Sequence, residues 1–150
     1  MVASGVGTGR TTLVDLAGAE PVAAGDDIAV GIDVVDISRF QRLLSLRGDA
    51  LTTRVFTAAE LRDCAEKPGR LAARFAAKEA TSKALGAGIG TVRWRDVEVL
   101  ADSSGQPRLR LHGAARALAR SRGVTTWTVS LTHDGSTAAA IVAAREGAGR

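Results

Sequence analysis

The segment from Arg70 to Leu85 restricts the folds open to this chain more than any other. Every residue in it is a good or tolerable helix former, and Gly86 supplies a natural end to the helix. Most of its uncharged residues are small, so other elements can pack closely against it. Its charged side chains would then be partly buried. The segment therefore predicts a long central helix with charged groups at its contacts with the rest of the fold.

Segments before this helix predict one strand and two further helices. Apolar residues alternate along Ile28–Val34 with the period of a β-strand, which places Asp33 on the face opposite the apolar row. Asp36 is a suitable N-cap for a helix that runs to about Arg47. The sequence Thr-Ala-Ala-Glu at 57–60 is a capping box, and it predicts a short helix that ends before a Pro-Gly pair.

Segments after the central helix predict two hairpins and one more helix. Residues 94–100 and 108–111 have the pattern of two strands joined by a turn, 114–122 that of a helix, and 126–132 and 137–144 that of a second strand pair. The predicted order is β-α-α-α-β-β-α-β-β. Because consecutive strands pair as hairpins instead of alternating with helices, we expect an α+β fold with an antiparallel sheet packed on helices, and a doubly wound fold is disfavoured.

The first 27 residues predict no folded element of their own. They are rich in Gly, Ala and Thr without a sustained period, so we interpret 1–27 as a flexible arm, with a short strand at 11–16 as its only candidate element, and 28–150 as the folded domain. Residues 5–12 superficially resemble a phosphate-binding loop, but Arg10 replaces the motif lysine and no strand precedes it. No apolar run suits a membrane span or secretory signal, so we expect a cytoplasmic protein without membrane contact.

The charge of the chain favours anionic partners. Lys and Arg number 20 against 16 Asp and Glu, which gives a net charge of +4. Single-strand nucleic-acid binders stack bases on aromatic side chains, and here aromatic residues are only 3%. A phosphorylated small molecule or an acidic protein fits the charge equally well. The one cysteine, Cys64, has no activating base near it in sequence, which favours an unreactive thiol.

Two charged pairs on the central helix are candidates for binding an anion. Arg74 and Lys78 lie four residues apart on one flank, and Glu79 and Lys83 form a second pair about a quarter-turn away. An ordinary exposed salt bridge would explain the second pair on its own. A glycine-rich run follows at 86–90, where backbone amides can approach and cradle a phosphate.

Asp33 is an acid between two apolar residues of a strand, so it must be solvated, paired or metal-bound. Together with Glu79, water and phosphate oxygens, it would suit Mg²⁺, a hard cation that rarely takes a cage made only of protein ligands. Mn²⁺ accepts similar oxygen-rich sites. His133 ends a predicted strand, in a polar cluster at a strand tip where sites often lie, whereas His112 has the pattern of a surface residue.

Four segments resemble the holo-acyl-carrier-protein synthase family, whose members are short 4′-phosphopantetheinyl transferases. They follow the family's order between about residues 29 and 144, and they are Gly31-Ile-Asp-Val-Val-Asp-Ile37, Phe56-Thr-Ala-Ala-Glu-Leu61, Arg74-Phe-Ala-Ala-Lys-Glu-Ala-Thr-Ser-Lys-Ala-Leu-Gly86 and Val129-Ser-Leu-Thr-His133. The resemblance implies a 4′-phosphopantetheinyl transferase-like α+β fold. It also implies a homotrimer with active sites at the subunit interfaces.

The resemblance further implies a reaction and its residues. The family transfers the 4′-phosphopantetheine group of coenzyme A to a serine of an apo acyl carrier protein and releases adenosine 3′,5′-bisphosphate. By position, Asp33 and Glu79 would bind Mg²⁺ and would act in catalysis with Lys83. The coenzyme A phosphates would be surrounded by Arg74, Lys78, Ser82, Lys83, Gly88, Thr132 and His133. The carrier protein would bind to the arginines of the first helix, which are Arg39, Arg42 and Arg47.

Several alternatives stay open at this point. Thr81 stands where the family usually has an aromatic residue, and Asp134 where a hydroxyl residue is common. These departures keep open a non-catalytic binder of coenzyme A or a carrier protein, and the basic charge keeps open a nucleic-acid-binding module. The general base is either a metal-bound water or Glu79 acting through one. The sequence does not distinguish carriers of fatty-acid, polyketide or peptide synthesis.

Overall fold

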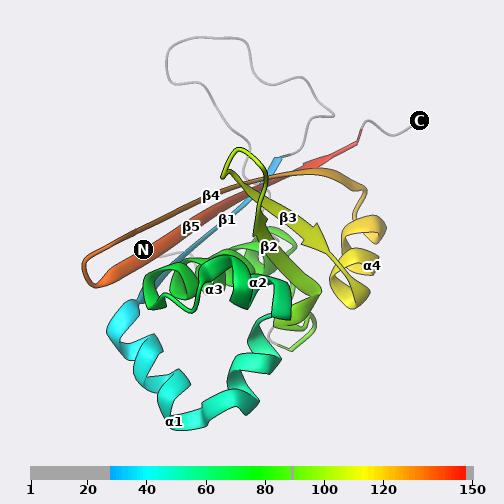
Figure 1. The fold of residues 1–150 in the computed structure, drawn as a ribbon. Helices are drawn as coiled ribbons and strands as arrows, with labels where there is room; N and C mark the ends of the chain where they lie inside the picture. The colour runs from blue at the N-terminus through cyan, green and yellow to red at the C-terminus, as the bar shows by residue number, and fades with distance from the viewer. Residues whose placement is uncertain (1–27, 89, 148–150) are drawn as a thin grey trace, which may run out of the picture.

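The computed structural model describes residues 28–88 and 90–147, which form a three-stranded and a two-stranded antiparallel sheet around a central helix (Figure 1). The elements are β1 (Ile28–Asp36), α1 (Ile37–Val55), α2 (Ala58–Cys64), α3 (Pro68–Ala84), the 3₁₀ turn η1 (Trp94–Asp96), β2 (Val97–Ala101), β3 (Pro107–Leu111), α4 (Gly113–Ser121), β4 (Val124–Asp134) and β5 (Thr137–Glu146). The predicted α+β class and element order are confirmed. The predicted arm at 1–27 lies outside the described residues, and so do the candidate strand at 11–16 and the loop-like stretch at 5–12.

The larger sheet has the order β1-β5-β4, and α3 packs across one of its faces (Figure 1). The hairpin of β2 and β3 covers another side of α3, while α1 extends away from the sheet. Buried alanines dominate the contact between α3 and β5, so the helix and the sheet approach closely. None of the described helices is long and apolar enough to cross a membrane.

The contact between α3 and β1 depends on Gly31. A Cβ atom at this position would lie 1.8 Å from the carbonyl oxygen of Ala80, so the two backbones touch where a side chain would stand. Val35 lies on the same face of β1 as Gly31 and is buried in the core, whereas Ile32 and Val34 point to the other face of the sheet. Ile32 and Val34 are 59% and 62% exposed there, beside Ile141 of β5 at 46%. The apolar row that predicted the strand thus lies outside the core of the single chain.

Gly31→Ala tests this contact. We expect the substitution to lower the free energy of unfolding by about 3 kcal/mol, because β1 or α3 must shift to admit the methyl group. The matched control is Gly88→Ala, where the nearest atom to an added Cβ, the Thr91 hydroxyl oxygen, is 3.6 Å away. Urea unfolding of both variants and the wild type measures the difference. Equal stability of the two variants would show that β1 tolerates a side chain at Gly31.

Two element boundaries differ from the sequence prediction. The helix predicted to end near Arg47 continues to Val55 across a break at Gly48, whose φ of 63° and ψ of −156° interrupt the helical conformation. The strand predicted from residue 94 begins only at Val97. Trp94–Asp96 forms a 3₁₀ turn instead. The Lys78 ammonium binds the carbonyl oxygen of Trp94, the first residue of the turn, and that of Val97, which follows the turn.

Candidate active site

The C-terminal end of α3 brings an ammonium group to the carboxylate of β1. Lys83 Nζ donates hydrogen bonds to Asp33 Oδ1 and to the carbonyl oxygen of Ile32, both at 2.8 Å. The Lys83 side chain is 55% exposed and that of Asp33 is 19% exposed. Asp33 is therefore paired with a cation at the surface, and solvent can still reach the pair.

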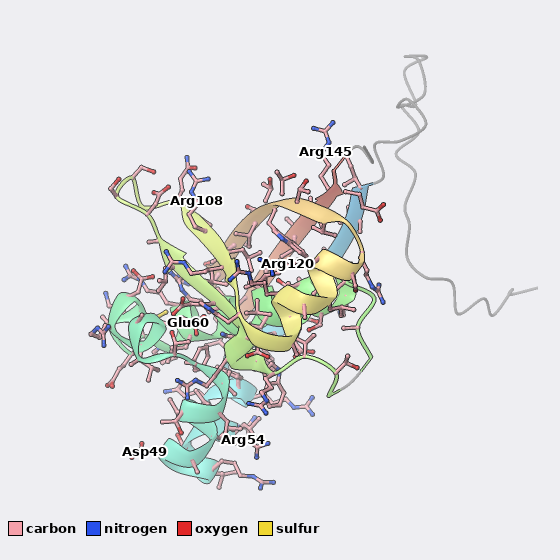
Figure 2. All side chains as sticks on the ribbon, turned by 90° about the vertical axis from the view of Figure 1, so that its right-hand side faces the viewer. Asp49, Arg54, Glu60, Arg108, Arg120 and Arg145 are labelled. Atoms are coloured by element: carbon pink, nitrogen blue, oxygen red, sulfur yellow. The ribbon has the colours of Figure 1, made fainter. Side chains whose placement is uncertain are left out.

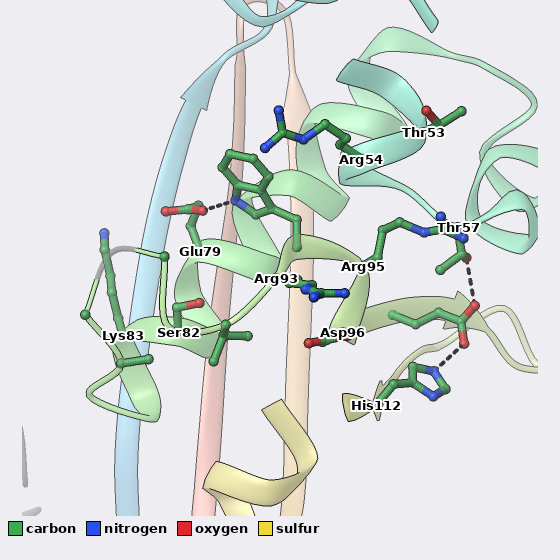
Figure 3. A pocket seen from close by; sticks show the side chains of 16 residues that line it. Thr53, Arg54, Thr57, Glu79, Ser82, Lys83, Arg93, Arg95, Asp96 and His112 are labelled. Atoms are coloured by element: carbon green, nitrogen blue, oxygen red, sulfur yellow. Dashed lines mark hydrogen bonds and ion pairs between the residues drawn. The ribbon is translucent and has the colours of Figure 1, made fainter. Parts of the chain in front are cut away.

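Glu79 lies one helical turn before Lys83 on α3. Its Oε1 accepts a hydrogen bond of 2.5 Å from the indole nitrogen of Trp94, which Figure 3 marks with a dashed line. Residues four apart on a helix are neighbours on its surface. Both acidic residues therefore lie next to Lys83, Asp33 through the ion pair and Glu79 through the helix.

A large cavity opens beside this cluster, with a volume of about 1380 Å³. Four of the residues predicted to bind coenzyme A or to act in catalysis line it, namely Glu79, Ser82, Lys83 and Gly88 (Figure 3). The lining also includes three arginines that the sequence analysis did not single out, Arg54, Arg93 and Arg95. The lining is of mixed charge, because Lys83 and the three arginines lie beside three acids, Glu79, Asp96 and Glu98. The four cationic groups can bind phosphate groups of a ligand.

The donor set fits a magnesium ion that shares its coordination with a substrate. Among residues 28–88 and 90–147 there is no group of three or more His, Cys, Asp or Glu side chains that could hold a metal. A closed cage of protein ligands is therefore not the form of site that this part of the chain offers. Mg²⁺ commonly takes one or two carboxylates together with water and phosphate oxygens, and Asp33 and Glu79 beside an open cavity match that pattern.

Lys78 occupies a different environment from the one predicted. Its ammonium is fully buried and donates to Glu60 Oε2 at 2.9 Å, to the Trp94 carbonyl oxygen at 3.0 Å and to the Val97 carbonyl oxygen at 2.5 Å. Burial lowers the pKa of Lys78, against the opposing effect of the Glu60 carboxylate. An ammonium has three N–H donors, and all three are used. The interpretation of Lys78 as a ligand of coenzyme A phosphates therefore disagrees with this structure.

The other predicted phosphate ligands line a second cavity of about 710 Å³, which includes Arg70, Arg74, Thr132 and His133. Arg74 Nη2 donates to Asp63 Oδ2 at 2.6 Å, while its Nε is buried without a hydrogen-bond partner among the described residues. The His133 ring packs against α3 at Gly69, where an added Cβ would lie 2.8 Å from the ring Nδ1. The arginines Arg70 and Arg74 bring positive charge and N–H donors to this cavity, which suits an anion.

His133 and Lys83 lie at opposite ends of α3, and Arg74 lies between them on the helix. Gly69, which contacts His133, is about 20 Å from Lys83 along the helix axis, because an α-helix rises by about 1.5 Å per residue. A pyrophosphate is far shorter than this distance. Within one copy of the chain, the structure therefore brings Asp33, Glu79 and Lys83 together but does not bring His133 to them.

The predicted docking arginines are placed as expected for a solvent-facing helix. Arg39, Arg42 and Arg47 are all exposed on α1, which extends away from the rest of the molecule (Figure 1). Leu46 of the same helix is 83% exposed. Nothing within the described part of the chain covers this apolar side chain.

The sequence analysis missed a buried acid beside the first cavity. Glu98 accepts a hydrogen bond from Thr57 Oγ1 at 2.7 Å and lies 3.1 Å from His112 Nε2. Burial raises the pKa of Glu98, but the hydrogen bonds from Thr57 and His112 outweigh it and hold the pKa below its usual value. His112 is exposed, as the sequence predicted, and its ring contacts Glu98 from the surface. The available signal was Glu98 itself, an acid between two valines of a predicted strand.

Cys64 is buried, as suits the unreactive thiol expected from the sequence. Burial raises the pKa of Cys64 to about 11, despite the opposing charge of Arg74. At neutral pH the side chain is a neutral thiol and not a nucleophilic thiolate.

Comparison with known proteins identifies the family. A family model described as the 4′-phosphopantetheinyl transferase superfamily matches residues 29–142. The holo-acyl-carrier-protein synthase of Moorella thermoacetica is 49% identical over 117 residues, which cover 76% of this chain and 91% of the relative. That of Streptomyces griseus is 50% identical over 120 residues, which cover 78% and 97% of the two chains.

A solved structure gives the same result for the fold. Helicobacter pylori holo-acyl-carrier-protein synthase in complex with coenzyme A superposes with a TM-score of 0.71 at 28% identity, covering 77% of this chain and 98% of that one. The matched region contains Asp33, Glu79 and Lys83 and extends over both ends of α3. The chain belongs to the 4′-phosphopantetheinyl transferase superfamily, as an enzyme of its holo-acyl-carrier-protein synthase family.

Proposed function

We propose that this chain transfers the 4′-phosphopantetheine group of coenzyme A to a serine of an apo acyl carrier protein, with Mg²⁺, and releases adenosine 3′,5′-bisphosphate. The observation that carries the proposal is the grouping of Asp33, Glu79 and Lys83 beside a cavity that three arginines also line. The names of the relatives and the coenzyme A in the Helicobacter pylori structure support this substrate pair.

The proposed reaction needs charge stabilisation more than covalent work by the protein. The serine oxygen forms a bond to the phosphorus that carries the pantetheine arm, and the bond from that phosphorus to the bisphosphate leaving group breaks. Negative charge spreads over the phosphoryl oxygens, where the Lys83 ammonium would stabilise it. Asp33 and Glu79 would hold Mg²⁺, which when bound orients the pyrophosphate and neutralises the leaving group. The serine proton would pass to a water molecule held by Glu79.

The cavity around Arg74 supports a role in binding a coenzyme A phosphate. The Arg74 guanidinium lines this cavity together with Arg70 and His133. Arginine is well suited to phosphate because its planar group offers several donors in a fixed geometry. Thr132 lines this cavity as well and would add a hydroxyl to the same phosphate.

Self-association would bring the two cavities together. The separation along α3 prevents His133 and Lys83 of one copy from contacting the same phosphate. The outer face of the larger sheet exposes Ile32, Val34 and Ile141, which is an apolar area that a second copy can cover. We infer that the chain forms a homotrimer in which the Asp33 end of one copy meets the His133 end of the next. Head-to-tail contacts form a closed ring where the rotation between successive copies closes, and the proposed homotrimer is such a ring.

The exposed arginines of α1 would bind the acidic carrier protein. Arg39, Arg42 and Arg47 project from a helix that is open to solvent, and Leu46 between them offers an apolar contact. Charge complementarity of this kind mainly accelerates association and sets its orientation.

Intact mass spectrometry tests the proposed function. The chain is mixed with an apo acyl carrier protein, coenzyme A and Mg²⁺, with and without a chelator, and the carrier is weighed. We expect a gain of one phosphopantetheine that the chelator prevents. Coenzyme A binding without any gain across carriers from several pathways would instead select the non-catalytic binder. Salt-sensitive binding to polynucleotides without transfer would select the nucleic-acid-binding module.

A further inference from the structure

The indole of Trp94 is the only side-chain group with a recorded hydrogen bond to Glu79 in the described residues. It donates to one carboxylate oxygen, Oε1, at 2.5 Å. An indole N–H is a donor without an acceptor lone pair, so it fixes the carboxylate without adding charge. Asp33 is held differently, by the charged ammonium of Lys83. The two acidic residues of the site therefore have one neutral and one cationic partner.

The position of the indole is fixed from two sides. The buried Lys78 ammonium binds the Trp94 carbonyl oxygen and the Val97 carbonyl oxygen, which holds the 3₁₀ turn that carries the indole. The Trp94 ring also contacts the ring of Phe75, with centroids 6.0 Å apart, and Phe75 in turn stacks on Phe40 at 4.9 Å. Phe75 lies one turn before Glu79 on α3. The indole therefore lies along the helix with its N–H directed at the carboxylate.

We propose that Trp94 is a positioning residue that orients the Glu79 carboxylate for a divalent cation. The hydrogen bond engages Oε1, which leaves Oε2 for the ion, and both Glu79 and Trp94 line the first cavity. Because the donor is neutral, Glu79 keeps its full negative charge for the metal, which a lysine or arginine partner would offset. This inference rests on the proposed function, in which Glu79 is a metal ligand.

Trp94→Phe removes the donor and keeps an aromatic ring against Phe75. Loss of a hydrogen bond that orients a metal ligand typically lowers metal affinity by about 10- to 100-fold. We therefore expect the concentration of Mg²⁺ that gives half-maximal transfer to rise by about 10-fold or more in this variant. The rate at saturating Mg²⁺ should fall less, since Asp33, Glu79 and Lys83 are all still present.

Trp127→Phe is the matched control, because Trp127 is the other of the two tryptophans and lies on β4. Trp127 lines the second cavity, so its variant controls only for the metal. It should keep the Mg²⁺ concentration that gives half-maximal transfer in the wild type, even where coenzyme A binding changes. It also leaves Trp94 as the one tryptophan of the chain, so fluorescence then reports on this site alone. Mn²⁺, which is paramagnetic, should quench Trp94 emission in a saturable manner with coenzyme A present, and Glu79→Gln should abolish the saturable part.

Direct Mn²⁺ binding, followed by electron paramagnetic resonance with coenzyme A present, separates this inference from the proposed function. The inference predicts weaker Mn²⁺ binding by Trp94→Phe at an unchanged thermal midpoint. Wild-type Mn²⁺ affinity and Mg²⁺ requirement in that variant would overturn it, even if transfer proceeds normally. Weakened Mn²⁺ binding in a chain that transfers nothing would contradict the proposed function and leave the role of Trp94 in place.

Discussion

Lys78→Met is expected to lower the free energy of unfolding by about 3–5 kcal/mol, because it leaves the Glu60 carboxylate buried without its cation. Both side chains of this ion pair are completely buried. Glu60 also accepts hydrogen bonds from the backbone N–H groups of Thr57 and Val99, so it joins the start of α2 to β2. The loss of Lys78 would further leave the carbonyl oxygens of Trp94 and Val97 without their donor.

Arg108→Met is the matched control for this prediction. Arg108 pairs with Asp102 at 2.8 Å, and its side chain is 68% exposed at the outer end of the β2–β3 hairpin, whereas Glu60 lies within the molecule (Figure 2). Exposed ion pairs contribute about 0–1 kcal/mol. Urea unfolding monitored by circular dichroism measures both variants. A loss of less than about 1 kcal/mol in Lys78→Met would mean that the ammonium is not a structural group.

Glu79→Gln and Asp33→Asn are each expected to lower kcat/KM for transfer by about 1000-fold or more. Each removes one charged oxygen ligand from the proposed magnesium site, and the metal supplies several kcal/mol of transition-state stabilisation. The thermal midpoint should change little, because solvent reaches the Asp33 side chain directly and the Glu79 side chain through the first cavity. Steady-state kinetics of carrier modification at saturating Mg²⁺ gives the rate ratio.

The control for these variants is Glu66→Gln, an equal change of charge at an exposed position in the turn between α2 and α3. It should transfer at the wild-type rate. If Glu79→Gln and Asp33→Asn both retained more than about a tenth of the wild-type kcat/KM, the assignment of these residues as metal ligands would be wrong.

Local chemistry explains the parts of the fold that the sequence predicted well. The capping box at Thr57 and Glu60 forms with both of its hydrogen bonds. The central helix ends just before Gly86, which has a left-handed backbone conformation with a φ of 57°. In both cases the atoms that decide the structure lie within a few residues of one another, so the sequence holds the whole interaction.

Long-range contacts explain the parts that the sequence did not predict. Lys78 belongs to a helix with an anion-binding pattern, but its partners are Glu60 and two carbonyl oxygens of a later turn. That turn exists where the sequence predicted a continuous strand from Trp94. The identity of each residue was informative, but the choice between a buried ion pair and a phosphate ligand depended on the packing of α2 and β2 against α3.

The candidate site was predicted only in part, because it too depends on contacts between residues that are distant in sequence. Asp33 and Lys83 are 50 residues apart in sequence, and the resemblance to the family grouped them correctly. His133 was grouped with them as well, yet it lies at the other end of α3. Order along the chain does not give distance in space, and the structure places the Lys83 and His133 halves of the proposed site at opposite ends of α3 within one copy.

Complementation between two inactive variants tests most directly the claim that these halves form one transferase site. Glu79→Gln and His133→Ala are coexpressed with different affinity tags and purified through both tags, and transfer is followed by intact mass of the carrier. Each variant alone should show less than about 1% of the wild-type rate. A mixed ring of three has one interface with both halves intact, so the account predicts recovery of about a third of the wild-type rate. No recovery in a folded mixed assembly, or full activity in a monomer, would contradict it.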